Sequence, residues 1–367
     1  MQDTELLKIR QAKYFSLSSK IAQLDNARLL EMFGEKSEPG GWQNNQVLEI
    51  SGEKVFVKRV PLTALEAENP FSAKNHYEMP PYYNYGVGSA GFGVFRELIA
   101  NIKTTNWVLS GEIEAFPLLY HYRIFPASDR GEVADEEQDR CYVEYWGGSE
   151  NIGKYIQERR SSQFELALFI EHIPQVLQPW IMESPRCYQG VLDELFATFD
   201  FLRKNGIIHF DAHDENILTD GKRTYLTDFG LVLDKSFPLA DAEKDFFEAH
   251  RYYDYGEAIL GLIRPLYFAY EAMDATGKAK LSERYGFLVE ESSRPAVRII
   301  LENLEEVHAS GHLRLDEVYI ACVAKYRSIV LLMDRFFMDL RRNLAKDTVF
   351  PGEELLRLLI ESGAISE

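Results

Sequence analysis

Residues 206–230 read GIIHFDAHDENILTDGKRTYLTDFG and contain two short apolar runs on either side of a tight turn. The first run is at 217–218, the turn is Asp-Gly at 220–221, and the second run is at 225–226. Apolar residues bounded by turn residues predict a loop, a strand, a turn, a strand and a second loop. A hairpin of this size brings the loop before it and the loop after it to the same end.

Three polar side chains stand in those two loops. Asp211 and Asn216 precede the predicted hairpin, and Asp228 follows it, so we expect them to converge on one small volume. A carboxylate and an amide oxygen suit Mg²⁺, which usually leaves coordination positions for phosphate and water. The remaining carboxylate can accept a proton from an attacking hydroxyl, which completes the parts that phosphoryl transfer needs. The bland alternative, a hairpin with solvated carboxylates, does not explain the spacing.

The stretch resembles the catalytic and metal-binding loops of the protein kinases, written His-Arg-Asp-x-x-x-x-Asn followed by Asp-Phe-Gly. Here the pattern is His209-Phe210-Asp211, then Asn216, then Asp228-Phe229-Gly230. The resemblance is strong over this stretch and loose over residues 45–260. It implies an α+β, bilobal protein kinase-like fold, with a small β-rich N-lobe and a larger, mainly helical C-lobe. It also implies ATP and Mg²⁺, with Asp211 as the catalytic base and Asn216 and Asp228 as metal ligands.

A second hairpin is predicted near the N-terminus, from apolar runs at 47–50 and 55–58 around Ser-Gly-Glu-Lys. Its second run ends Val-Phe-Val-Lys58, which is similar to the kinase Val-Ala-Ile-Lys. The resemblance implies that Lys58 holds the α/β-phosphates, whereas the alternative is an ordinary edge-strand lysine. The only glycine-rich candidate before Lys58 is the connection around Gly40 and Gly41, which departs from the kinase Gly-x-Gly-x-x-Gly.

A literal Gly-x-Gly-x-x-Gly occurs later, as Gly86-Val-Gly88-Ser-Ala-Gly91. A rival interpretation makes it the phosphate loop and Lys103 the lysine. We disfavour that interpretation because residues 94–103 have helical periodicity and the motif alone is weak evidence. Residues 61–93 are then a long insertion that covers the nucleotide or helps to hold its phosphates.

The helix after this insertion begins near Arg96-Glu97. By resemblance, Glu97 is the carboxylate that orients the phosphate lysine, although a first-turn Glu is also favoured by the helix dipole alone.

Residues 116–125 and 140–145 are predicted to be strands, followed by the connector Glu144-Tyr-Trp146-Gly-Gly. The resemblance implies that this connector is the hinge at which backbone groups of Glu144 and Trp146 contact adenine. We therefore divide the chain into an N-lobe (1–145), a hinge (146–148) and a C-lobe (149–367).

Four further segments have helical periodicity: residues 4–33, 188–205, 250–262 and 315–342. Asn-Gly at 205–206 is a helix stop signal that delivers the chain to the opening stretch. The 250–262 segment includes Asp254 and loosely resembles the kinase helix that anchors the catalytic loop. The apolar stripe of 315–342 predicts a core helix.

Three departures bear on the acceptor. Phe210 replaces the arginine that pairs with a phosphorylated activation loop in kinases, and no Ala-Pro-Glu follows Asp228. His213 gives Asp-x-His-x-x-Asn, which is similar to the aminoglycoside phosphotransferases. We interpret the chain first as an atypical Ser/Thr protein kinase acting on a protein substrate. The alternatives are a small-molecule kinase and, beyond that, a nucleotide-binding pseudokinase or an AMP transferase.

Composition bounds the partners. With 40 basic and 58 acidic residues the chain has a net charge of −18, which repels nucleic acid and anionic membranes. The three scattered cysteines have no metal or disulfide spacing, which fits a reducing compartment. The N-terminal residues lack the pattern of a signal peptide, and no apolar run is long enough to cross a membrane. These features predict a cytoplasmic protein.

Overall fold

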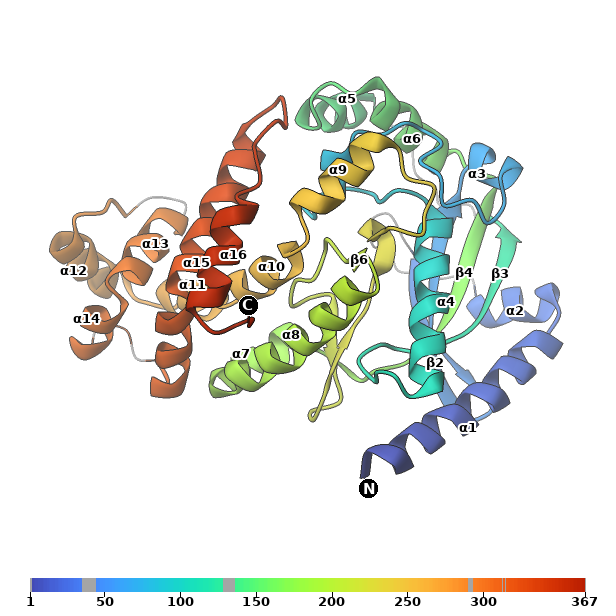
Figure 1. Ribbon diagram of the computed structural model, residues 1–367, viewed down its shortest axis with the longest axis horizontal. Coiled ribbons are helices and arrows are strands. Elements are labelled where there is room, and N and C mark those ends of the chain that lie inside the picture. The colour runs from blue at the N-terminus through green and yellow to red at the C-terminus, as the bar shows by residue number, and fades with distance from the viewer. Residues whose placement is uncertain are drawn as a thin grey trace.

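The computed structural model describes residues 2–34, 44–127, 136–289, 293–311, 313 and 315–366. The fold is α+β, as expected, with one four-stranded antiparallel sheet and many helices. In Figure 1 the sheet lies to the right and helices α11 to α16 lie to the left. The strand order is β1-β2-β4-β3, with bounds β1 (Asn44–Ile50), β2 (Glu53–Leu62), β3 (Leu119–Pro126) and β4 (Phe164–Glu171).

The predicted N-terminal hairpin is present. Ser51 and Gly52 connect β1 to β2 with φ values of 56° and 80°, the positive φ pair that tight hairpin turns require. β2 continues past Lys58 to Leu62, and Lys58 pairs with Leu168 of β4. Lys58 therefore lies in the middle of a central strand, flanked by hydrogen-bonded neighbours on both sides. The Gly40 and Gly41 connection lies outside the described residues.

The predicted strand at 140–145 is wrong, because these residues belong to helix α5 (Glu136–Tyr145). Arg140 and Glu144 pair along the helix with i,i+4 spacing, and Tyr142 and Tyr145 both face the 83–93 segment. The strand that completes the sheet is instead β4, whose sequence FELALFIE is almost entirely buried. A strand buried on both faces has no alternation to distinguish it from a helix.

The predicted hinge 146–148 is a turn between α5 and α6 (Glu150–Arg160). We divided the chain at these residues because we expected a strand at 140–145, and that strand is absent. The chain leaves the sheet later, after Glu171 at the end of β4.

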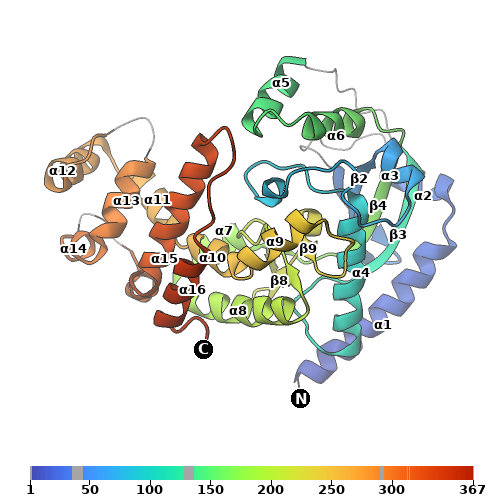
Figure 2. The same ribbon diagram turned by 45° about the horizontal axis from the view of Figure 1, so that its top comes forward.

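Helices cover the sheet. The predicted 4–33 helix is two helices, α1 (Gln2–Gln23) and α2 (Asn26–Phe33), with Asp25 capping the second. α4 (Val94–Ser110) stands against the sheet, and its Leu98 packs on Val60 and Leu166 in a separate apolar cluster. Figures 1 and 2 both show α1 and α4 beside β2, β3 and β4.

The rest of the described chain is mainly helical. The predicted helices at 188–205, 250–262 and 315–342 are present as α8, α10 and α15, and the α15 stripe is buried except for Val318, which is 55% exposed. The bounds are α3 (Ala64–Glu68), α7 (Leu177–Glu183), α8 (Tyr188–Lys204), α9 (Asp241–Ala249), α10 (Tyr253–Leu260), α11 (Ile263–Glu271), α12 (Ala275–Tyr285), α13 (Arg294–Glu302), α14 (Leu304–Ala309), α15 (Glu317–Arg342) and α16 (Gly352–Glu361).

Between the sheet and these helices lies the predicted catalytic hairpin. Its strands are β7 (Ile217–Thr219) and β8 (Thr224–Leu226), and β5 (Gln175–Val176) pairs with β7. A second short pair, β6 (Ile207–Ile208) with β9 (Leu233–Asp234), joins the two ends of the surrounding segment. Together they hold the loops before and after the hairpin side by side.

Within the described part of the chain, the longest and most apolar helices still fall short of what a membrane crossing requires.

Candidate functional site

The loops on either side of the β7–β8 hairpin meet as predicted. The Asn216 amide nitrogen donates to the Asp211 carboxylate over 2.7 Å, and the Thr227 N–H donates to the Asn216 carbonyl over 3.0 Å. His209 reaches across beneath them, with 3.0 Å between its Nε2 and the Thr227 carbonyl oxygen. Asp211, Asn216 and Asp228 therefore border one region, as the hairpin argument required.

Lys58 lies between two carboxylates. Its Nζ is 2.5 Å from Glu97 Oε1 and 2.9 Å from Asp228 Oδ1, and the Lys58 and Glu97 side chains are each only 4% exposed. Burial alone would lower the pKa of Lys58, but Asp228 and Glu97 outweigh it and raise that pKa. Burial likewise opposes ionisation of Asp228, yet Lys58 lowers the Asp228 pKa. Strand β2, helix α4 and the loop after β8 thus bring together a charged triad of Lys58, Glu97 and Asp228. The expected pairing of Lys58 with Glu97 is present.

Lys103, the lysine of the rival interpretation, faces a different region. Its Nζ pairs with Asp234 at 2.5 Å and lies 3.3 Å from the Ser236 hydroxyl. Residues 94–103 belong to helix α4, as their periodicity indicated.

Helix α10 holds the backbone of the loop that contains Asp211. The Asp254 carboxylate accepts the N–H groups of His209 and Phe210, each over 2.9 Å. One turn later, Glu257 accepts the Ala212 N–H over 2.7 Å. Helix α10 thus anchors this loop through three backbone N–H groups that donate to two buried carboxylates.

Two residues of the site have backbone conformations that are unusual for side chains of their size. Phe210 has φ of 65° and Asp228 has φ of 64°. Each such residue costs about 1–3 kcal/mol and persists only where its surroundings enforce it. Phe210 is fully buried and stacks against Phe246 and Tyr253. Phe210 therefore lies inside a buried aromatic cluster.

Asp211 and His209 have strongly shifted acidities. Burial, reinforced by the Asp228 charge, raises the pKa of Asp211 to about 8. Burial lowers the pKa of His209 to about 4, and its Nδ1 accepts the Asp211 N–H over 3.2 Å. His209 is therefore neutral and hydrogen-bonds to the backbone of both loops. A raised carboxylate pKa is typical of a group that exchanges protons.

A cavity of about 380 Å³ opens beside the triad. Its apolar lining includes Val47, Phe56, Ile170 and Leu218, and its polar lining includes Lys58, Glu97, Asn216 and Asp228. One wall is the segment 171–176, which leaves strand β4 and enters β5. The volume is within the usual range for small-molecule sites, and an apolar slot next to a few convergent charges is their typical lining.

Glu144 and Trp146 are not among the residues that line this cavity. Trp146 is fully buried against Tyr82 and Tyr83, and the Glu144 side chain is 67% exposed on α5. Their expected position at the hinge followed from the wrong strand at 140–145.

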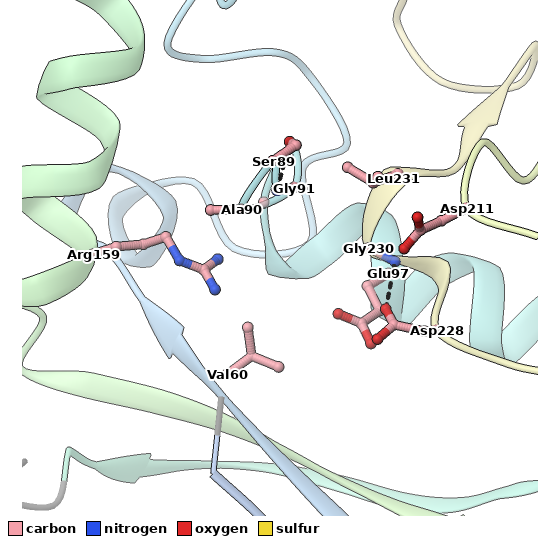
Figure 3. A pocket seen from close by; sticks show the side chains of 11 residues that line it. Val60, Ser89, Ala90, Gly91, Glu97, Arg159, Asp211, Asp228, Gly230 and Leu231 are labelled. Atoms are coloured by element: carbon pink, nitrogen blue, oxygen red, sulfur yellow. Dashed lines mark hydrogen bonds between the residues drawn. The ribbon is translucent and has the colours of Figure 1, made fainter. Parts of the chain in front are cut away.

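A smaller cavity of about 120 Å³ adjoins the same carboxylates. Figure 3 shows Glu97, Asp211 and Asp228 on one side of it, the Ser89–Gly91 segment at its upper edge and Arg159 opposite. The Phe92 N–H donates to the Gly230 carbonyl over 3.3 Å. The 61–93 insertion therefore reaches the site and brings the Gly86–Gly91 motif there. Lys103, which the rival interpretation paired with this motif, contacts Asp234 instead.

Close approach explains the first glycine of that motif. A Cβ on Gly86 would lie 2.1 Å from Asp211 Oδ1, so no larger residue fits without displacing the carboxylate or the loop. Sequence reasoning gave no role to Arg159, which lines this cavity from helix α6, because no motif surrounds it.

The donor set fits a magnesium ion only in part. No group of three His, Cys, Asp or Glu side chains that could enclose a metal is found in the described ranges. Asp228 and Asn216 both line the larger cavity, and the Asn216 nitrogen points to Asp211, which leaves its oxygen for a cation. Two oxygen ligands suit Mg²⁺ because this ion usually shares its coordination with phosphates and water.

No protein-family model matches the chain, and no curated protein is similar to it in sequence.

Proposed function

We propose that the chain is an ATP- and Mg²⁺-dependent phosphotransferase with a bilobal protein kinase-like fold. The observation that carries the proposal is the Lys58–Glu97–Asp228 triad, in which Lys58 and Glu97 are buried and Asp228 is 30% exposed, beside Asp211 and Asn216. A structural salt bridge needs neither the neighbouring aspartate with a raised pKa nor a cavity that opens on the triad. The sheet with α1 to α6 would form the N-lobe, and segment 172–174 would connect it to the helical lobe.

Each residue has a role that its position supports. Lys58, fixed by Glu97, binds phosphate oxygens, and Asn216 and Asp228 would hold the metal. Bound magnesium would supply charge neutralisation at the phosphates. Asp211 orients the acceptor hydroxyl and, in its ionised form, takes the proton of that hydroxyl. The acceptor oxygen forms a bond to the γ-phosphorus while the bond from that phosphorus to the β,γ-bridging oxygen breaks, and ADP leaves.

The acceptor is a separate question. Asp-Phe-Gly and Val-Phe-Val-Lys favour our first interpretation, an atypical Ser/Thr protein kinase. The second candidate, a small-molecule kinase, is supported by a cavity of about 660 Å³ beside the catalytic loop. Its lining comes from the loop and from helices α11, α13 and α15, and includes His213, Asp214, Arg264, Tyr267, Arg294 and Asp334. Such a volume accommodates a small polar molecule.

Label transfer from γ-labelled ATP tests the proposal. The protein and its Asp211→Ala variant are incubated with Mg²⁺ and labelled ATP in a desalted cell extract, and label is counted separately in proteins and in small molecules. Asp211-dependent label in proteins supports the first candidate, and Asp211-dependent label in small molecules other than phosphate supports the second. Absence of Asp211-dependent γ-label, with transfer of α-label instead, would replace phosphotransfer with AMP transfer.

A further inference from the structure

Arg159 lies at the C-terminal end of helix α6 and is only 2% exposed. Its Nη1 donates to the Tyr155 hydroxyl over 2.9 Å, which fixes the plane of the guanidinium. In Figure 3 the side chain extends from α6 toward the middle of the small cavity, facing Glu97 and Asp228 across it. The mechanism proposed above gives this arginine no task.

Burial opposes the charge of Arg159, but its neighbours Tyr155 and Glu66 outweigh burial and raise the pKa of Arg159, so the guanidinium stays charged at the wall of the cavity. Burial raises the pKa of Glu97 on the opposite wall, and the Arg159 charge, after that of Lys58, acts against this rise. Arginine also presents a rigid, planar set of donors that matches the oxygens of a phosphate, and it remains charged at any physiological pH. A cavity with this cation on one side and Asp211 on the other suits a phosphoryl group in transit.

Lys58 and Arg159 border different cavities. Lys58 is held on one side of Asp228, in contact with the larger cavity, whereas Arg159 borders only the smaller one. Both cavities share Glu97 and Asp228, so they form two compartments on either side of the triad. A nucleotide with its base in the larger compartment would place its last phosphate at the smaller one.

We propose that Arg159 binds the terminal phosphate of ATP in the 120 Å³ cavity, opposite Asp211, with the Ser89–Gly91 segment closing the edge of the chamber. This deepens the proposed function and rests on it. The insertion and helix α6 then share the work that a glycine-rich loop does in protein kinases. The phosphate contact comes from a side chain that follows β3 in the chain, far from the β1–β2 hairpin.

Equilibrium binding of nucleotides tests the proposal without any turnover. Affinities for Mg·ATP and Mg·ADP are measured by calorimetry on the wild type, Arg159→Gln and Arg160→Gln. Arg160 is the matched control, because it is the next residue of the same helix and pairs outward with Asp139. We expect the wild type to bind ATP roughly tenfold to a hundredfold more tightly than ADP, which is the contribution of a hydrogen bond to a charged group. Arg159→Gln should lose this preference, and Arg160→Gln should keep it.

A second variant covers the possibility that Arg159→Gln does not fold. Arg159→Lys keeps the buried charge but not the two parallel donors, so the preference for ATP should fall several-fold while the unfolding temperature stays close to that of the wild type. An unchanged preference for ATP in either folded variant would overturn the role of Arg159 and leave the phosphotransferase proposal standing. A wild type that binds neither nucleotide would overturn both.

Discussion

At the scale of single residues, the chain contains two lysines that sequence patterns offered for the same role. Lys58 is buried between Glu97 and Asp228, whereas Lys103 pairs with Asp234 away from both cavities. Their environments, and not their motifs, distinguish them. Glycine spacing alone would have favoured Lys103.

Replacing Lys58 with Met should lower phosphotransfer by about 100- to 1,000-fold, the usual cost of removing one preorganised donor at a reacting charge. Lys103→Met is the control and should retain activity within a few-fold. Label transfer from γ-labelled ATP, with circular dichroism to verify folding, measures both. Equal losses in the two variants would show that the triad has no special role.

Gly86→Ala should abolish transfer, since its Cβ would lie 2.1 Å from Asp211 Oδ1. Gly190→Ala is the matched control, because a Cβ added to this residue of helix α8 would meet no atom within 4 Å. It should leave activity unchanged and raise the free energy of unfolding by about 0.5–1 kcal/mol, the helix propensity difference. Full activity in Gly86→Ala would contradict the close approach of the insertion to Asp211.

At the scale of elements, the sequence predicted the helices and strands that have a clear apolar periodicity or a turn signal. It failed for the elements that lack both. The catalytic hairpin and helices α8, α10 and α15 followed from turn residues and apolar spacing. Strand β4 was missed because its buried run has no alternation. The hinge that we predicted at Glu144 and Trp146 rested on a strand at 140–145, and these residues are helical instead. The approach of 86–93 to Asp211 depends on tertiary contacts between distant segments, which no local pattern encodes.

Helix α1 is tied to the end of β4 by a buried ion pair. Arg10 Nη2 lies 2.6 Å from Glu171 Oε2, and Arg10 also donates to the carbonyl oxygens of Glu114 and Phe116. Arg10→Gln should lower the free energy of unfolding by about 3–5 kcal/mol, because it leaves a buried carboxylate without its partner. It should also weaken nucleotide binding, because Glu171 lines the larger cavity.

Urea unfolding measures this loss, and Arg28→Gln is the control. Arg28 pairs with Glu31 on the surface of α2 at i,i+3 spacing, so its loss should change stability by only about 0.5 kcal/mol or less. Similar effects in the two variants would mean that α1 is not anchored through Glu171.

The contact between the insertion and helices α9 and α10 predicts a pH dependence. His250 is buried, with its Nε2 2.6 Å from the Tyr85 hydroxyl and its Nδ1 2.6 Å from the Phe246 carbonyl. Burial lowers its pKa from the usual 6.5 to about 4. The unfolded chain therefore binds the proton first, and stability should fall as the pH drops from about 6.5 to about 4, by about 3 kcal/mol for this group.

His250→Gln removes the titrating group while keeping one donor and one acceptor. Its free energy of unfolding should fall less steeply between about pH 6.5 and about pH 4 than that of the wild type, although it starts lower near neutral pH. Parallel curves for the two proteins would show that His250 is not held neutral in the folded state.

At the scale of the whole molecule, the charged triad spans parts of the chain that lie far apart in sequence. Lys58 and Glu97 come from the sheet and α4, whereas Asp211, Asn216 and Asp228 come from the two loops beside the β7–β8 hairpin. A nucleotide between them would contact both halves. Because only the folded chain offers this arrangement, binding should raise the unfolding temperature in a concentration-dependent manner.

The most direct test of the proposed phosphotransfer measures nucleotide affinity and label transfer on the same preparations of the wild type and Asp211→Ala, with Mg²⁺ and γ-labelled ATP in a desalted extract. We expect Asp211→Ala to bind ATP within a few-fold of the wild type and to transfer no label above background. Undiminished transfer by Asp211→Ala, or a wild type that neither binds ATP nor transfers its phosphate, would contradict the proposal.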